Sequence, residues 1–139
     1  MFRMLAPGRF LSLTLIAALV ACGSAFDPDA PLTGSWSAPP FGDNSTLILH
    51  LRQVDSTVFG GGDYTVKVWL DSAVQRTGPT YDVRITGTYG STVSLVMQYR
   101  LGPGTAAMAF GGVLDDPEHL RGILDFGGDR RDSVTFTRR

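Results

Sequence analysis

The sequence is poor in the residues that enzymes and metal proteins use. Its 139 residues include one cysteine, Cys22, which excludes a disulfide within the chain. The two histidines, His50 and His119, fall short of the three or four ligands that a zinc site needs. There is no G-x-S-x-G motif, and no helix-forming sequence follows the glycines at 60–62, as a phosphate-binding loop would require. We therefore predict a protein that is not an enzyme and has no catalytic residue, cofactor or metal site.

Residues typical of exposed helix faces are also scarce, since Lys67 and Glu118 are the only lysine and glutamate. Apolar and polar residues instead alternate with a period of two. Over 81–89 one face carries the apolar or aromatic residues and the other face carries Asp82, Arg84 and two threonines. The segment 92–101 alternates in the same way. Because the two segments are joined by the short link YGST, they predict a β-hairpin with one solvent-exposed face.

Eight segments of the chain follow this pattern. They are 32–37, 46–54, 57–70, 81–89, 92–101, 105–114, 119–126 and 132–139. The links between them are short, so consecutive segments should pair as an antiparallel up-and-down sheet. Eight such strands can close into a barrel that has no free edge, and this all-β barrel is the predicted fold. Glycines within the pattern, at 60–62, 87, 111, 112 and 122, predict the bulges and bends that closure requires.

The N-terminal segment predicts export. Arg3 and Arg9 precede an uncharged run at 10–21 that ends in LVAC, at Cys22. A positive start before a short apolar run is the layout of a secretory signal peptide. The run is shorter than the roughly 20 residues of a membrane-spanning helix. LVAC resembles the lipobox of bacterial lipoproteins, and this resemblance implies that residues 1–21 are removed and that Cys22 is lipidated, with palmitate among its acyl chains.

This processing would define the location and the domains of the mature protein. Loss of Arg3 and Arg9 changes the formal net charge from −1 to about −3, and the absence of a basic patch argues against nucleic acid as a partner. Residues 22–32, rich in Pro and Asp, are the predicted lipidated tether, and 33–139 the barrel domain. The protein should be anchored through Cys22 to a membrane of the bacterial cell envelope. By the lipoprotein rule, Gly23 after the cysteine favours the outer membrane of a Gram-negative host.

The first and last predicted strands carry a further resemblance. GSW, at Gly34 to Trp36, resembles the G-x-W motif of lipocalins and the similar first strand of avidins, both calycin-type barrels. In lipocalins the tryptophan packs at the barrel floor beside an arginine of the last strand, and Arg138 is the counterpart here. The chain lacks the C-terminal helix of lipocalins and most of the tryptophans that form the avidin biotin site. The resemblance therefore implies the fold and the Trp36–Arg138 pair, but not biotin binding.

Two interpretations of function remain. In the first, the barrel binds or carries a small apolar ligand, since eight strands can enclose one. The candidate lining mixes aromatic and flexible apolar side chains: Tyr89, Leu95, Met97, Tyr99, Met108 and Phe110. The same residues would equally serve as a packed core.

In the second interpretation the protein is an envelope interaction or inhibitor module that acts through its loops or outer wall. Ala107, Ala109 and Gly111 form a flat apolar face that would bind a partner or a second copy. The segment 71–81 is longer than a hairpin needs, which favours a mobile connection; the alternative is a loop at the rim of a binding site. The sequence DDPEH at 115–119 has the oxygens for a weak Ca²⁺ contact but lacks the EF-hand spacing, which favours a solvated turn.

Overall fold

Residues 26–42, 44–69 and 75–139 are described by a computed structural model, and the predicted signal peptide and Cys22 lie outside this part. Eight antiparallel strands form one closed barrel in chain order, which confirms the predicted all-β fold. The strands are β1 (Gly34–Ser37), β2 (Thr46–Val54), β3 (Thr57–Trp69), β4 (Gln75–Tyr89), β5 (Val93–Leu101), β6 (Gly104–Asp116), β7 (His119–Asp125) and β8 (Arg131–Arg138). No helix long and apolar enough to cross a membrane occurs in the described segments.

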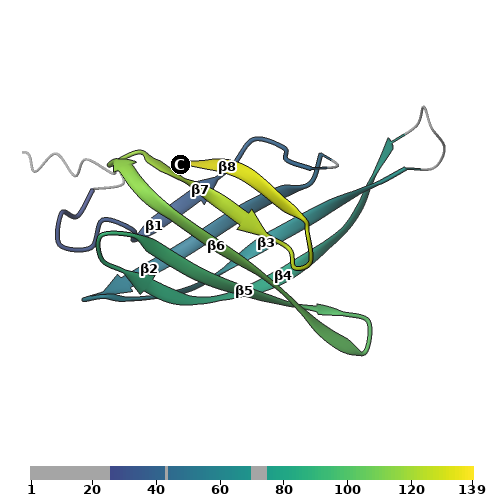
Figure 1. The fold of residues 1–139 in the computed structure, drawn as a ribbon, viewed down its shortest axis with the longest axis horizontal. Coiled ribbons are helices and arrows are strands. Elements are labelled where there is room, and N and C mark those ends of the chain that lie inside the picture. The colour runs from purple at the N-terminus through teal and green to yellow at the C-terminus, as the bar shows by residue number, and fades with distance from the viewer. Residues whose placement is uncertain (1–25, 43, 70–74) are drawn as a thin grey trace, which may run out of the picture.

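The two ends of the barrel differ. Tight turns at 55–56, 90–92 and 117–118 lie at one end, which we call the closed end, and the chain also ends there. The links 38–45, 102–103 and 126–130 lie at the other end, the open end. Figure 1 shows β3 and β4 projecting past the open end as a long ribbon, and the β5–β6 hairpin projecting beside the same end.

Burial alternates along the strands as predicted. In β5, for example, inward residues such as Leu95 and Met97 are fully buried, whereas Ser94 and Gln98 are exposed. The tight links bring these inward positions from every strand into one hydrophobic core. A side chain without accessible surface borders no space that admits a water molecule, so the middle of the barrel is filled with side chains.

Strand glycines allow the sheet to coil tightly enough to close. A Cβ atom on Gly60 would lie 1.9 Å from the carbonyl oxygen of His50 on the neighbouring strand. Gly112 and Gly122 pair with each other, and a Cβ on either would approach the Phe110 ring to 2.7 Å. Because no other residue fits at such contacts, these positions mark where the strands approach most closely. Gly111 differs, since it faces open space on the outer wall.

The expected loop at 71–81 is largely a strand. β4 begins at Gln75 and pairs with β3 out to Trp69, so only 70–74 separates the two strands, and those residues lie outside the described part. Cross-strand hydrogen bonds support the ribbon: the Thr65 and Thr80 hydroxyls are 2.8 Å apart, and Lys67 donates to the Thr77 hydroxyl at 2.8 Å. Such pairs stabilise a two-stranded ribbon where no core covers it.

The predicted tether also contributes to the barrel. Leu32 is fully buried and Pro31 is buried, although both fall within the expected tether 22–32. The backbone N–H of Leu32 donates to the side-chain oxygen of Gln53, at 3.1 Å. Leu32 is an isolated apolar residue in a Pro- and Asp-rich segment, so no periodic pattern predicts its burial. Its burial follows from the tertiary contact with Gln53.

Candidate functional site

The six side chains predicted to line a cavity do not lie together. Leu95, Met97, Met108 and Phe110 occupy the filled middle of the barrel and are at most 2% exposed. Tyr89 lies beside the 90–92 turn at the closed end, whereas Tyr99 lies near the open end of β5. The four central residues therefore form a packed core in this structure, and only Tyr99 reaches a place where a ligand could bind without opening the barrel.

Five aromatic rings gather at the open end. We call them the aromatic mouth: Phe41, Tyr64, Tyr81, Tyr99 and Phe126. The ring centres of Tyr64 and Tyr81 each lie 5.4 Å from that of Tyr99. Phe41 stacks on Tyr64 at 6.5 Å, and Phe126 lies 6.0 Å from Phe41. Contacts of this kind contribute about 0.5–1.5 kcal/mol each beyond simple burial, so the cluster is a stable platform.

Local structure explains why these rings meet. Tyr64 and Tyr81 are directly opposite each other on β3 and β4. Phe41 is held in the 38–45 link by two reciprocal backbone hydrogen bonds with Ser45, each 3.0 Å long. Phe126 follows β7, and the guanidinium carbon of Arg130 lies 5.1 Å from its ring centre.

The three tyrosine hydroxyls of the mouth are available for binding. Among the described residues, none of these hydroxyls has a hydrogen-bond partner, and no buried side-chain oxygen is left without one. The hydroxyls of Tyr64, Tyr81 and Tyr99 therefore reach solvent. Burial raises the pKa of Tyr99, and the neighbouring Tyr64 and Tyr81 raise it further, while Arg130 lowers it. At neutral pH Tyr99 is thus a neutral phenol that can both donate and accept a hydrogen bond.

Sequence reasoning included Tyr99 but missed the other four rings of the mouth. A usable signal was present, because counting from the 90–92 turn pairs Val83 with Tyr99 and so brings Tyr81 next to Tyr99. Phe41 and Phe126 lie outside the strands, in links whose shape has no periodic signal.

The closed end is built around Trp36 and Arg138. These two residues are directly opposite each other on β1 and β8, and the guanidinium carbon lies 4.3 Å from the indole ring centre. The guanidinium also donates to the carbonyl oxygens of Pro31, Thr33 and Pro117. Burial lowers the pKa of Arg138 and Glu118 raises it, yet an arginine keeps its charge in a protein.

Gly34 completes this arrangement. Its φ angle is 141°, in a region that favours glycine, and a Cβ there would lie 2.6 Å from Nη1 of Arg138. The GSW motif and Arg138 are thus parts of one structure, in which glycine leaves the space that the guanidinium occupies. The indole N–H of Trp36 donates to the Leu32 carbonyl oxygen at 3.0 Å. The indole N–H of Trp36 and the guanidinium of Arg138 are therefore both occupied by internal hydrogen bonds.

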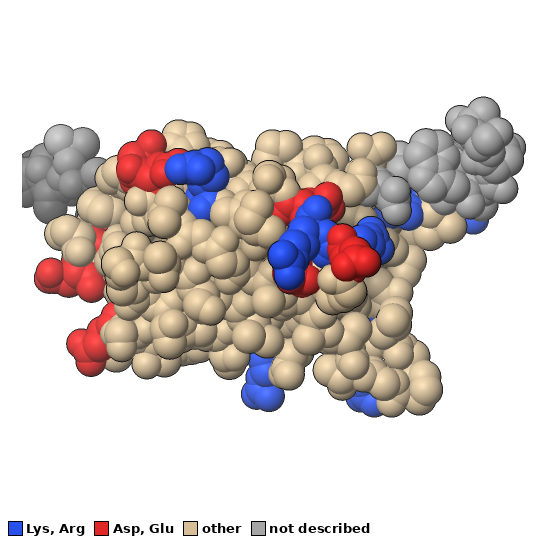
Figure 2. All heavy atoms as spheres, in the orientation of Figure 1, with Lys and Arg blue, Asp and Glu red and all other residues tan. Residues whose placement is uncertain are grey.

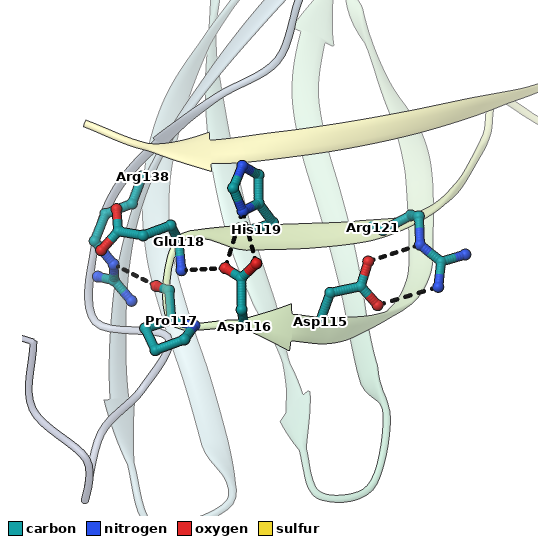
Figure 3. Close-up of polar contacts among 7 residues, drawn as sticks. All are labelled: Asp115, Asp116, Pro117, Glu118, His119, Arg121 and Arg138. Carbon is teal, nitrogen blue, oxygen red and sulfur yellow. Dashed lines mark hydrogen bonds and ion pairs between the residues drawn. The ribbon is translucent and has the colours of Figure 1, made fainter.

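The DDPEH segment forms the tight hairpin turn between β6 and β7 (Figure 3). The Asp115 carboxylate accepts two hydrogen bonds from Arg121, at 2.8 and 3.1 Å. The Asp116 carboxylate accepts from the Glu118 backbone N–H at 2.7 Å and contacts the His119 ring at 2.9 Å. These hydrogen bonds lower the pKa of both aspartates. Within the described ranges no group of three or more residues could hold a metal ion.

The outer wall carries an uncharged surface (Figure 2). We call its apolar part the outer strip: Val96, Ala107, Ala109, Gly111 and Ile123. Val96 lies opposite Ala109, Gly111 lies opposite Ile123, and the two large side chains are 42% and 43% exposed. The strip includes the face predicted from the sequence, Ala107, Ala109 and Gly111, and extends it by Val96 and Ile123.

In comparisons with known proteins, no protein-family model, curated protein or solved structure matches this chain. The eight-stranded antiparallel barrel is consistent with a calycin-like fold.

Proposed function

We propose that the protein is a non-catalytic lipoprotein of the bacterial cell envelope, whose barrel binds a small, partly apolar molecule at the aromatic mouth. One observation carries the binding proposal: three tyrosine hydroxyls that bind no described residue lie among five contacting rings at the open end. Aromatic surface with a few unsatisfied polar groups is the usual composition of a small-molecule site.

The direction of the mouth agrees with anchoring through Cys22. Phe26, the first described residue, lies at the closed end, where Arg138 is 5.7 Å from its ring centre. Four residues span at most about 14 Å, so a lipid on Cys22 would keep the closed end near the membrane. The aromatic mouth would then face away from the membrane, toward the molecules of the surrounding compartment.

Anchoring is tested by the variant Cys22→Ser in the native host. We expect it to lose labelled palmitate and to leave the membrane fraction, because Cys22 is the only thiol in the chain. Incorporation of palmitate into the variant would contradict the lipobox hypothesis.

Binding is tested by mass spectrometry of the whole protein purified from its native membrane. We expect a small molecule to co-purify with the wild type and with Tyr89→Ala, whose ring lies at the closed end. The molecule should be lost from Tyr81→Ala, which removes a half-buried ring of the mouth. If Tyr81→Ala retains the molecule as well as the wild type does, the aromatic mouth is not its site.

The outer strip supports a second candidate function, self-association. The strip has no charged side chain, and Asp125, which lies opposite Ala109, is paired with Arg131 at 2.9 Å, so two copies related by a two-fold axis could bring the strip together without opposing unpaired like charges. We expect Ala109→Arg to abolish a dimer seen by sedimentation, and Ser94→Arg on the neighbouring strand to do so less completely. A wild type that sediments as a monomer at all concentrations tested would contradict this candidate.

A further inference from the structure

We propose that the ligand of the aromatic mouth is a neutral sugar ring of an oligosaccharide, lying with one face against the tyrosines. This inference rests on the proposed function and names its ligand class. It follows from the depth of the mouth, from the chemistry of its rim and from the protonation of the Tyr99 hydroxyl.

The mouth is shallow. Leu47, opposite Tyr64, and Leu124, two residues before Phe126, are fully buried, and Val83, opposite Tyr99, is 4% exposed, so side chains fill the barrel next to the rings. An acyl chain or another long apolar guest would need a channel between these residues, and a channel would give them accessible surface. Phe41 and Tyr64 are themselves only 8% and 6% exposed, so a ligand that fits without rearrangement must lie over the half-buried rings of Tyr81, Tyr99 and Phe126.

A ligand that lies flat on the rings must also provide hydrogen-bond partners for the hydroxyls at the rim of the mouth. The hydroxyls of Tyr64, Tyr81 and Tyr99 would lose water beneath it, and a buried hydroxyl without a partner costs about 1–3 kcal/mol. A purely apolar molecule offers no partner. A sugar ring offers several hydroxyls around its edge and C–H groups on its face, which make weak contacts with aromatic rings.

The protonation state of Tyr99 agrees with a neutral ligand. Because burial and the two neighbouring tyrosines raise the pKa of Tyr99, its hydroxyl stays protonated and exchanges hydrogen bonds in both directions. Sugar hydroxyls also donate and accept, so either orientation of each hydrogen bond is satisfied.

The test uses the whole protein in lipid nanodiscs and saturation-transfer NMR with two soluble probes, chitotriose and maltotriose. We expect at least one probe to bind, with the strongest transfer to C–H protons on one ring face. Tyr81→Phe and Tyr99→Phe keep the rings and remove one hydroxyl each. Each should weaken binding about threefold to tenfold, since a neutral hydrogen bond contributes about 0.5–1.5 kcal/mol. The matched control, Tyr89→Phe at the closed end, should bind as the wild type does.

The outcomes separate this inference from the proposed function. If neither probe binds while Tyr81→Ala still releases a co-purifying apolar molecule, the sugar inference is wrong and the site is correct. If the probes bind equally to the wild type and to the Tyr81→Phe, Tyr99→Phe double variant, the hydroxyls do not select the ligand and the inference is again overturned. If nothing binds at the mouth in either experiment, both proposals fail.

Discussion

Replacing Arg138 by alanine perturbs the closed end at its most connected residue. The substitution removes three hydrogen bonds to the backbone carbonyls of Pro31, Thr33 and Pro117, together with the contact over the Trp36 indole. A cation over an indole contributes about 0.5–2 kcal/mol, and a hydrogen bond from a charged donor contributes about 1.5–3 kcal/mol where it is shielded from water. Because Arg138 is only partly buried, water screens its hydrogen bonds, and each is expected to contribute about 0.8 kcal/mol, as an ordinary hydrogen bond does. With the lower end of the range for the indole contact, we expect a total loss of about 3 kcal/mol.

The measurement is urea unfolding followed by circular dichroism, with the melting temperature as a second readout. For a domain of this size a loss of 3 kcal/mol lowers the melting temperature by about 12 °C. Arg138→Lys should fall between the wild type and Arg138→Ala, because a lysine keeps the charge but cannot hold three carbonyls with a planar fork.

Arg139 provides the matched control. Its side chain is exposed, and its backbone N–H donates to the Ser35 carbonyl oxygen in any variant. Arg139→Ala should therefore change stability by less than about 0.5 kcal/mol. Equal losses in Arg138→Ala and Arg139→Ala would refute the argument that the guanidinium contacts hold the closed end together.

Three further predictions concern stability. Gly34→Ala should destabilise the fold by about 2 kcal/mol in urea melts because of its φ angle and the 2.6 Å approach to Arg138; an equal loss in the Arg138→Ala background would contradict the steric part. Met97→Trp and Met108→Trp should each lower the free energy of unfolding by about 1–3 kcal/mol, because they overpack the filled core. Unchanged urea midpoints would contradict this and would show that the core contains unfilled space. The lowered pKa of Asp116 means that its contribution to stability is present above about pH 4 and is lost as the pH falls through the folded-state pKa. The Asp116→Asn variant should therefore show a shallower fall of the urea midpoint between pH 5 and pH 2, and an unchanged fall would contradict this contribution.

The eight strands could be predicted from the sequence because one-sided burial imposes their period. Each strand has the core on one side and solvent on the other, so residues such as Leu95 and Ser94 must alternate in polarity. Short turns then fix which strands are neighbours. The extension of β4 back to Gln75 could not be predicted in this way, because the β3–β4 ribbon projects past the core and no burial imposes an alternation there.

The position of a residue along the barrel axis was harder to predict than its side of the sheet. Tyr89 and Tyr99 both point inward, yet they lie at opposite ends, because β4 ends and β5 begins at the closed-end turn. Alternation alone shows only that both side chains face the barrel interior, and so it assigns both to the same cavity lining. The register counted from the turn separates them, and it is this register that assembles Tyr81 and Tyr99 at the mouth.

The two ends of the barrel differ in how their central side chains are hydrogen-bonded, although the hydroxyl of Tyr89 at the closed end also binds no described residue. At the closed end the indole N–H of Trp36, the guanidinium of Arg138 and the amide of Gln53 all bind backbone atoms, which is what a structural plug requires. At the open end the rings pack against one another in the same manner, but their hydroxyls bind no described residue. A cluster that served only to cap the barrel would be as stable with phenylalanine at Tyr81 and Tyr99. The presence of tyrosine at both positions is therefore the feature that favours a ligand at this end.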